Sequence, residues 1–174
     1  VVVVAVVRKR NDSGADLDAE AIEAGTSYVL EGLKNRETVL VVAPAERTDS
    51  FIRMLRENGV DVEKFRRRNM LQLGEGMDNP VKQAAFISKV ASSRDSRFRL
   101  LGDMLWTRTK GWSLEALRDL EEAVPPRHAA GGKFFLCQYP LNSLSGQEIM
   151  MAFETHSHTI FRGEIRKSPY FRRT

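Results

Sequence analysis

Residues 134–171 read FFLCQYPLNSLSGQEIMMAFETHSHTIFRGEIRKSPYF and carry the clearest local structure signals in the chain. The run Phe134–Tyr139 is short, apolar and rich in aromatic residues, and it ends at Pro140. These properties favour a buried strand over a helix. A second segment with strand character follows from His158 to Ile165. The stretch therefore predicts a strand, a loop, a helix and a second strand in succession.

The helix of this unit has a start signal in the sequence. Ser145 and Glu148 have the spacing of a capping box, in which each side chain bonds a backbone N–H at the helix N-terminus. His156 falls near the predicted end, where an imidazolium interacts favourably with the helix dipole. The apolar side is predicted to consist of Ile149, Met150 and Phe153, and Met150-Met151 is interpreted as core.

Outward from this unit, further apolar runs predict buried strands. These runs are Val1–Val7, Thr38–Ala43, Met70–Leu73 and Phe98–Leu101. The run at residues 38–43, TVLVVA, has no polar alternation, which is typical of a parallel strand covered on both faces. Asn11–Gly14 is predicted to form a turn after the first strand.

Segments with apolar residues at helical spacing lie between these strands. The predicted helices run from Asp16 or Asp18 to about Leu33, from Thr48 or Asp49 to Gly59, from Pro80 to near Ser93, and from Trp112-Ser113 to Pro125-Pro126. Residues 60–65 are predicted to be a connector and residues 128–133 a loop. This alternation predicts an α/β fold with a mostly parallel central sheet and helices on both faces. The last strands, near Phe134 and Ile160, are predicted to form a more mixed edge.

The composition predicts one soluble globular domain, residues 1–174, with 42% hydrophobic and 29% charged residues. The net charge is +4, and part of the excess lies in Arg66–Arg68 and between Arg162 and Arg173. We interpret both clusters as solvated basic faces. Because zinc-finger spacing, a helix-turn-helix and an aromatic-interleaved basic strand are missing, direct nucleic-acid binding is not expected.

Cysteine use and hydropathy predict a cytoplasmic protein. Cys137 is the single cysteine, which excludes an internal disulfide and fits a reducing compartment. No apolar run approaches the ~20 residues that span a bilayer, so no membrane contact is expected. The run Val1–Val7 is too short for a secretory signal, and its charges follow it rather than precede it.

An α/β chain of this size invites comparison with nucleotide-binding proteins. The phosphate-binding motif G-x-x-x-x-G-K-[ST] is absent, and so are G-x-G-x-x-G and G-x-S-x-G. Residues 10–18, between the first strand and the first helix, read RNDSGADLD. Their three carboxylates would repel a polyphosphate instead of binding it.

Four segments in order resemble elements of one known family. Residues 31–40 (EGLKNRETVL) are similar to its G-L-x-x-G-E-x-v-l-v element, with Asn35-Arg36 where glycine is usual nearby. Residues 101–106 (LGDMLW) are similar to its R-v-x-G-E-M-x-W element, with Asp103 in place of Glu. Residues 136–139 (LCQY) match its L-C-x-Y element.

The C-terminal part follows the same family. His156, Ile160 and Gly163, followed by residues 168–171 (SPYF), are similar to its H-x-x-v-I-x-x-G…N-P-x-F ending, with Ser168 in place of Asn. The family is the MEDS domain, the methanogen/methylotroph DcmR-type sensory domain, and the resemblance covers about residues 19–171. It implies a three-layer sandwich similar to RecA and KaiC cores without their phosphate loop. It also implies a sensory module of transcriptional regulators and signalling proteins that senses one-carbon or hydrocarbon-derived compounds. The family has no established catalytic residues, so none is assigned.

The predicted ligand-binding residues are Asp103, Trp106, Tyr139 and His156. Asp103 ends a strand, where RecA-like enzymes place a metal-binding acid, and its competing role is to cap or hydrogen-bond the chain. Tyr139 lies at a strand end, where ligands of open α/β sheets bind. Trp106 and His156 have competing structural roles, as a core residue and as a helix-end cation.

No metal and no cofactor are expected. Cys137 is interpreted as core packing, because no cation flanks it in the sequence. His156 and His158 would need a third metal ligand from elsewhere, such as Asp103 or Glu154, and the spacing matches no recognised pattern.

These observations support three hypotheses. The first is a non-enzymatic domain that senses a small molecule and acts on an output module or a partner signalling protein through a population shift. The second is a degenerate nucleotide-binding protein that kept affinity through Asp103 and basic residues. The third is a protein-interaction scaffold with an empty pocket. The C-terminal arginines would allow ion pairs across a homodimer.

Overall fold

The structure is a computed structural model that describes residues 2–7, 15–92, 97–124, 132–140, 143–161 and 164–172. Seven strands form one sheet, which lies between two layers of helices. The strands are β1 (Val2–Val7), β2 (Thr38–Val42), β3 (Leu71–Gly74), β4 (Phe98–Asp103), β5 (Lys133–Pro140), β6 (His158–Phe161) and β7 (Glu164–Lys167). Their spatial order is β3-β2-β4-β5-β1-β6-β7, and every neighbouring pair is parallel except β6–β7. The mostly parallel α/β sheet predicted from the alternating pattern is therefore confirmed.

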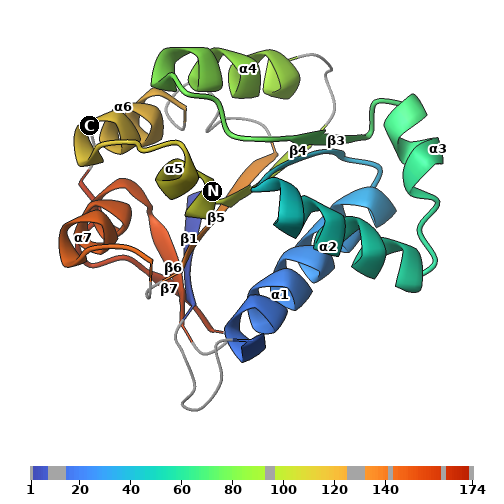
Figure 1. The fold of residues 1–174 in the computed structure, drawn as a ribbon, viewed down its shortest axis with the longest axis horizontal. Helices are drawn as coiled ribbons and strands as arrows, with labels where there is room; N and C mark the ends of the chain where they lie inside the picture. Colours follow the sequence, from blue (N-terminus) through green and yellow to red (C-terminus); the bar gives the residue numbers. More distant parts are fainter. Residues whose placement is uncertain are drawn as a thin grey trace.

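Seven helices connect the described strands. They are α1 (Ala15–Lys34), α2 (Ala45–Glu57), α3 (Val62–Arg67), α4 (Pro80–Ser92), α5 (Leu105–Thr109), α6 (Leu114–Ala123) and α7 (Gly146–Thr155). Figure 1 shows α4, α5 and α6 on one side of the sheet and α1 and α2 on the other. Across the described ranges, no helix combines the length and the apolar character that crossing a membrane requires.

Strand β5 shows how the two faces of the sheet are filled. Side chains alternate along a strand, so Phe135, Cys137 and Tyr139 pack under α4, α6 and α7. Leu136 joins the core under α1 and α2, and Gln138 donates to the Ala21 carbonyl of α1 at 2.8 Å. This division matters for function, because residues next to each other in a strand face different helical layers.

The start of α2 differs from the prediction. The helix begins at Ala45, one turn before Thr48 and Asp49. The carbonyl of Pro44 accepts from the N–H groups of Arg47 and Thr48 at 3.1 and 2.9 Å, so Pro44 is the residue that opens the helix. The predicted end is confirmed, since Gly59 follows the helix with φ of 78°.

Two further elements were not predicted correctly. Residues 60–65, expected to be a connector, contain the start of α3, where the Asp61 side chain accepts from the Lys64 N–H at 2.9 Å. Residues 158–165 were expected to be one strand, but residues 158–161 form β6 and residues 164–165 begin β7, which pairs with β6 antiparallel. The mixed edge is thus present near Ile160, whereas Phe134 lies in β5, which is parallel to both of its neighbours. The predicted turn at 11–14, the proline stop at 125–126 and most of the loop at 128–133 lie outside the described residues.

Helix α7 begins with the predicted capping box. The Ser145 hydroxyl accepts from the Glu148 N–H at 3.3 Å, and Glu148 accepts from the Ser145 N–H at 2.7 Å. Met151 is buried as expected, but Met150 is 43% exposed, which corrects its assignment to the apolar side. His156 follows the helix directly as its C-terminal cap.

A buried ion pair joins β2 and β4 at their N-terminal ends. Arg99 Nε donates to Glu37 Oε2 at 2.6 Å, and Arg99 Nη1 donates to the Tyr28 carbonyl of α1 at 3.1 Å. The guanidinium also lies 4.7 Å from the centre of the Tyr28 ring. A Cβ at Gly32 would lie 3.0 Å from Arg99 Cδ and 2.8 Å from Val39 Cγ2. Glycine at position 32 therefore lets α1 approach this pair closely.

Candidate functional site

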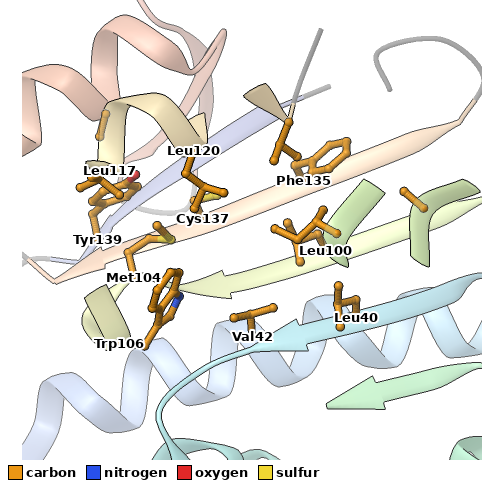
Figure 2. Close-up of a cluster of buried hydrophobic side chains, with 14 of the residues drawn as sticks. Leu40, Val42, Leu100, Met104, Trp106, Leu117, Leu120, Phe135, Cys137 and Tyr139 are labelled. Atoms are coloured by element: carbon orange, nitrogen blue, oxygen red, sulfur yellow. The ribbon is translucent and has the colours of Figure 1, made fainter. Parts of the chain in front are cut away.

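A cavity lies between strands β2, β4 and β5 and helices α4, α5 and α6. Its volume is about 30 Å³, room for roughly two water molecules, since one water needs about 10–15 Å³. Figure 2 shows Val42, Leu100 and Trp106 in the buried cluster on this face of the sheet. The apolar side chains of the wall come from Val42, Ile87, Leu100, Met104, Leu120, Val124 and Phe135. The polar groups of the lining come from Gln83, Glu121, Cys137 and the Trp106 indole.

Two residues that line this cavity carry a buried N–H donor without a hydrogen-bond partner among the described residues. Gln83 is fully buried, and its Oε1 accepts from the Met77 N–H at 2.9 Å, which assigns the other end of the amide as the NH₂ group. That Nε2 group is unpartnered, and so is the indole Nε1–H of Trp106. Buried donors without an acceptor are rare in folded proteins and call for an explanation.

Trp106 is held tightly in place. Its ring packs edge to face against Trp112, with centroids 4.7 Å apart, and Trp112 Nε1 donates to the Met77 carbonyl at 3.0 Å. On the other side, a Cβ added at Gly76 would lie 1.8 Å from Trp106 Cε3. The loop before α4 therefore requires glycine at position 76, so that its backbone can cover the indole ring.

Gly76→Ala is expected to lower the free energy of unfolding by about 1–3 kcal/mol, because the added methyl group overlaps the ring of a buried tryptophan. Urea unfolding followed by tryptophan fluorescence measures the change. Gly146→Ala is the matched control, since nothing lies within 4 Å of a Cβ at Gly146. Equal stability of the two variants would contradict the tight contact between Gly76 and Trp106.

Next to the cavity lies a buried polar cluster. Tyr139 donates its hydroxyl to Glu121 Oε1 at 2.5 Å, and its ring lies 5.9 Å from the His156 ring, edge to face. The other carboxylate oxygen, Glu121 Oε2, lies 3.5 Å from His156 Nε2. Burial, and next the Glu121 charge, raise the pKa of Tyr139 well above its ordinary value, so its hydroxyl remains a donor.

Cys137 adjoins the same cluster. One donor atom each from Glu121, Cys137 and His156 lie within 4.8 Å of one another, and all three residues are buried. Burial raises the pKa of the Cys137 thiol well above its ordinary value, and the Glu121 charge adds to the rise. In the protein as described, Cys137 is thus a thiol, as expected for a packed residue.

The structure divides the four predicted ligand-binding residues into separate places. Trp106 lines the cavity, and Tyr139 and His156 meet beside it in the polar cluster. Asp103 faces the opposite helical layer, where its Oδ2 accepts from Arg47 Nη1 of α2 at 2.7 Å. Its Oδ1 accepts from the Leu105 N–H at 3.1 Å, which is the capping role weighed in the sequence.

Sequence analysis missed Gln83 and Glu121. Glu121 follows Leu117 by four residues on the buried side of α6, and Gln83 precedes Ile87 by four residues on the buried side of α4. A polar residue in phase with a helix's apolar stripe was the available signal. Such a residue is buried together with the stripe and then needs a polar partner.

Comparison with solved structures shows the fold family. A KaiC-like protein from the hyperthermophilic archaeon Pyrococcus horikoshii OT3 matches with a TM-score of 0.62 at 16% identity, covering 99% of this chain and 81% of that one. The flagellar accessory protein FlaH from Methanocaldococcus jannaschii matches with a TM-score of 0.56 at 13% identity, covering 94% and 74%. At these identities the likeness establishes the RecA-like fold alone.

Comparison of the sequence with known proteins and protein families identifies the family of the chain. No curated protein matches the chain. The sequence profile of one family, the methanogen/methylotroph DcmR sensory domain (MEDS), matches residues 15–157. This range includes the cavity, the polar cluster and His156. The chain therefore belongs to the MEDS family of sensory domains.

Proposed function

We propose that this domain senses a small molecule in the cavity between α4, α5 and the sheet, and that it regulates an output module without catalysing a reaction. The observation that carries the proposal is the pair of unpartnered buried donors, Gln83 Nε2 and Trp106 Nε1. A ligand with a hydrogen-bond acceptor would satisfy these groups, which otherwise destabilise the folded state by roughly 1–3 kcal/mol each.

The size of the cavity limits the ligand. With apolar walls and a volume of about 30 Å³, it suits a molecule of roughly two to four heavy atoms. The best ligands of this size reach about −1.5 kcal/mol per atom, hence about −3 to −6 kcal/mol and a Kd of about 0.04–6 mM. We propose a one-carbon or small hydrocarbon-derived compound that carries one hydrogen-bond acceptor.

The two donors also suggest how binding is transmitted. Gln83 belongs to α4 and Trp106 to α5, so a ligand that accepts from both donors would join two helices that otherwise lack this connection. The ligand would then stabilise one arrangement of α4, α5 and the Gly76 loop over others, and a partner that binds that arrangement would respond. The Arg47–Asp103 ion pair lies in the opposite layer and has no part in this step.

The test uses the two tryptophans of the chain, whose indole N–H groups give separate NMR signals. We expect methanol, formamide or acetone at millimolar concentration to shift the Trp106 signal. The Trp112 signal serves as the internal reference, because its Nε1–H already donates to the Met77 carbonyl. The measured quantity is the saturation of the Trp106 shift with ligand concentration.

A variant that fills the cavity gives the control. A Cβ at Gly102 would meet Met104 Sδ at 3.4 Å and Cys137 Sγ at 3.7 Å, which are ordinary contacts, so Gly102→Ala should fold and lose the saturating shift. Gly146→Ala carries the same change away from the cavity and should retain it. A response to ATP or ADP with Mg²⁺ would favour the degenerate nucleotide-binding alternative. The absence of any saturating shift would contradict sensing at this cavity and favour the scaffold.

A further inference from the structure

We propose that Glu121, Cys137 and His156 form a binding site for a divalent transition metal, with Zn²⁺ as the expected ion. The three residues come from α6, β5 and the end of α7, and their donor atoms lie within 4.8 Å of one another. Carboxylate and imidazole are donor types that Zn²⁺ prefers in proteins, and the Cys137 thiol becomes the third, a thiolate, when the ion displaces its proton to solvent. All three are buried, so bulk water does not compete for the ion.

The hydrogen bond at His156 Nδ1 leaves Nε2 as the metal-binding atom. His156 Nδ1 lies 2.9 Å from the Ala152 carbonyl oxygen, which only accepts hydrogen bonds, and 3.0 Å from the Thr155 hydroxyl, which donates to the Met151 carbonyl at 3.0 Å. The tautomer with its proton on Nδ1 fits both neighbours. In that tautomer the lone pair lies on Nε2, which is buried and has no hydrogen-bond partner in the described part of the chain. Metal-ligating histidines are commonly oriented by a bond of this kind at the second ring nitrogen.

A cation between Nε2 and Glu121 explains their arrangement. The two atoms are 3.5 Å apart, which is too long for a good N–H···O hydrogen bond. In a tetrahedral site with Zn–N and Zn–O distances of about 2.0–2.2 Å, ligand atoms lie about 3.3–3.6 Å apart. This pair thus already has the spacing of zinc ligands, and the Cys137 Sγ lies within 4.8 Å of the donor atoms of the other two residues.

The surroundings complete the site in two ways. Tyr139 donates to Glu121 Oε1 and so directs the other carboxylate oxygen toward His156. Glu121 and Cys137 also line the cavity, which places an open fourth coordination position on the cavity side. The metal would bind whether or not a sensed molecule occupies that position, so the site stands independently of the proposed function.

This proposal replaces the expectation that the chain binds no metal. The third ligands considered from the sequence are engaged elsewhere: Asp103 with Arg47, and Glu154 with Arg118 and Arg172. The ligand set drawn from the structure has no short motif, because three separate elements supply it.

Titration of the purified, chelator-treated chain with Co²⁺ tests the site. We expect one equivalent to bind and to give the near-ultraviolet thiolate-to-cobalt charge-transfer band, and Zn²⁺ to remove that band. Cys137 is the single cysteine of the chain, so the band has one possible source. Glu121→Gln, Cys137→Ser and His156→Gln should each weaken metal binding at least 100-fold.

Two neighbouring substitutions are matched controls. Glu122→Gln changes the next carboxylate of α6, which is 42% exposed, and His158→Gln changes a histidine two residues from His156. Both should bind Co²⁺ like the unchanged chain. Absence of the charge-transfer band from the unchanged chain would overturn the proposal, whatever the variants do. Binding retained by His156→Gln or Glu121→Gln at the level of these controls would overturn it as well.

Discussion

Replacing Arg99 with Met is expected to lower the free energy of unfolding by about 3–5 kcal/mol. The substitution leaves the Glu37 carboxylate, whose side chain is 1% exposed, without the guanidinium that compensates its charge. It also removes the hydrogen bond to the Tyr28 carbonyl, which connects α1 to the sheet. Urea unfolding followed by circular dichroism at neutral pH measures the loss.

Two comparisons show whether the buried charge is the cause. The double substitution Glu37→Gln with Arg99→Met should be more stable than Arg99→Met alone, because no charge is then left without its partner. Arg66→Met breaks an ion pair to Glu63 in which both side chains are about half exposed, and should change stability by only about 0–1 kcal/mol. An Arg99→Met variant as stable as Arg66→Met would contradict the role assigned to the buried pair.

Trp106→Ala is the second substitution with a large expected effect, a loss of about 3–5 kcal/mol. Trp106 is 2% exposed, and its removal would leave a large void next to the existing cavity. Thermal unfolding measures the loss. Indole added to the variant should raise its unfolding temperature, because a ligand that binds only the folded state stabilises it.

The contact between Trp106 and Gly76 makes the two substitutions non-additive. Gly76→Ala should destabilise the chain when Trp106 is present and have little effect in Trp106→Ala, since the overlapping ring is gone. A double-mutant cycle measures this coupling. Effects that simply add would show that the loop and the indole do not constrain each other.

The sequence was sufficient for the architecture because buried strands and amphipathic helices have different periods. The apolar run at residues 38–43 contains β2, and the helix predicted to end at about Leu33 is α1, which ends at Lys34. The errors occur at element ends, where one local contact decides the outcome. Pro44 supplies the carbonyl that starts α2, and Asp61 caps a helix too short to show a period.

The site was less predictable, because strand alternation separates residues that are close in sequence. Leu100 and Gly102 line the cavity, so Asp103 faces the other layer, where Arg47 binds it. Tyr139 at the end of β5 and His156 at the end of α7 are in contact. The order of the elements along the chain did not by itself predict this contact. Whether Gln83 of α4 and Glu121 of α6 are buried depends on which side of each helix faces the sheet, and only the structure shows this for single residues.

The position of β1 has a consequence for the synthesis of the protein. This first strand lies between β5 and β6, and the partners of Val3 are Leu136 and His158. At roughly 5–20 residues per second, a ribosome takes about 8–30 s to advance from Val3 to His158, so the nascent strand must wait that long for its second neighbour. A valine-rich segment left without partners for such a time is a natural target for a chaperone, and we expect slow, aggregation-sensitive refolding at high concentration.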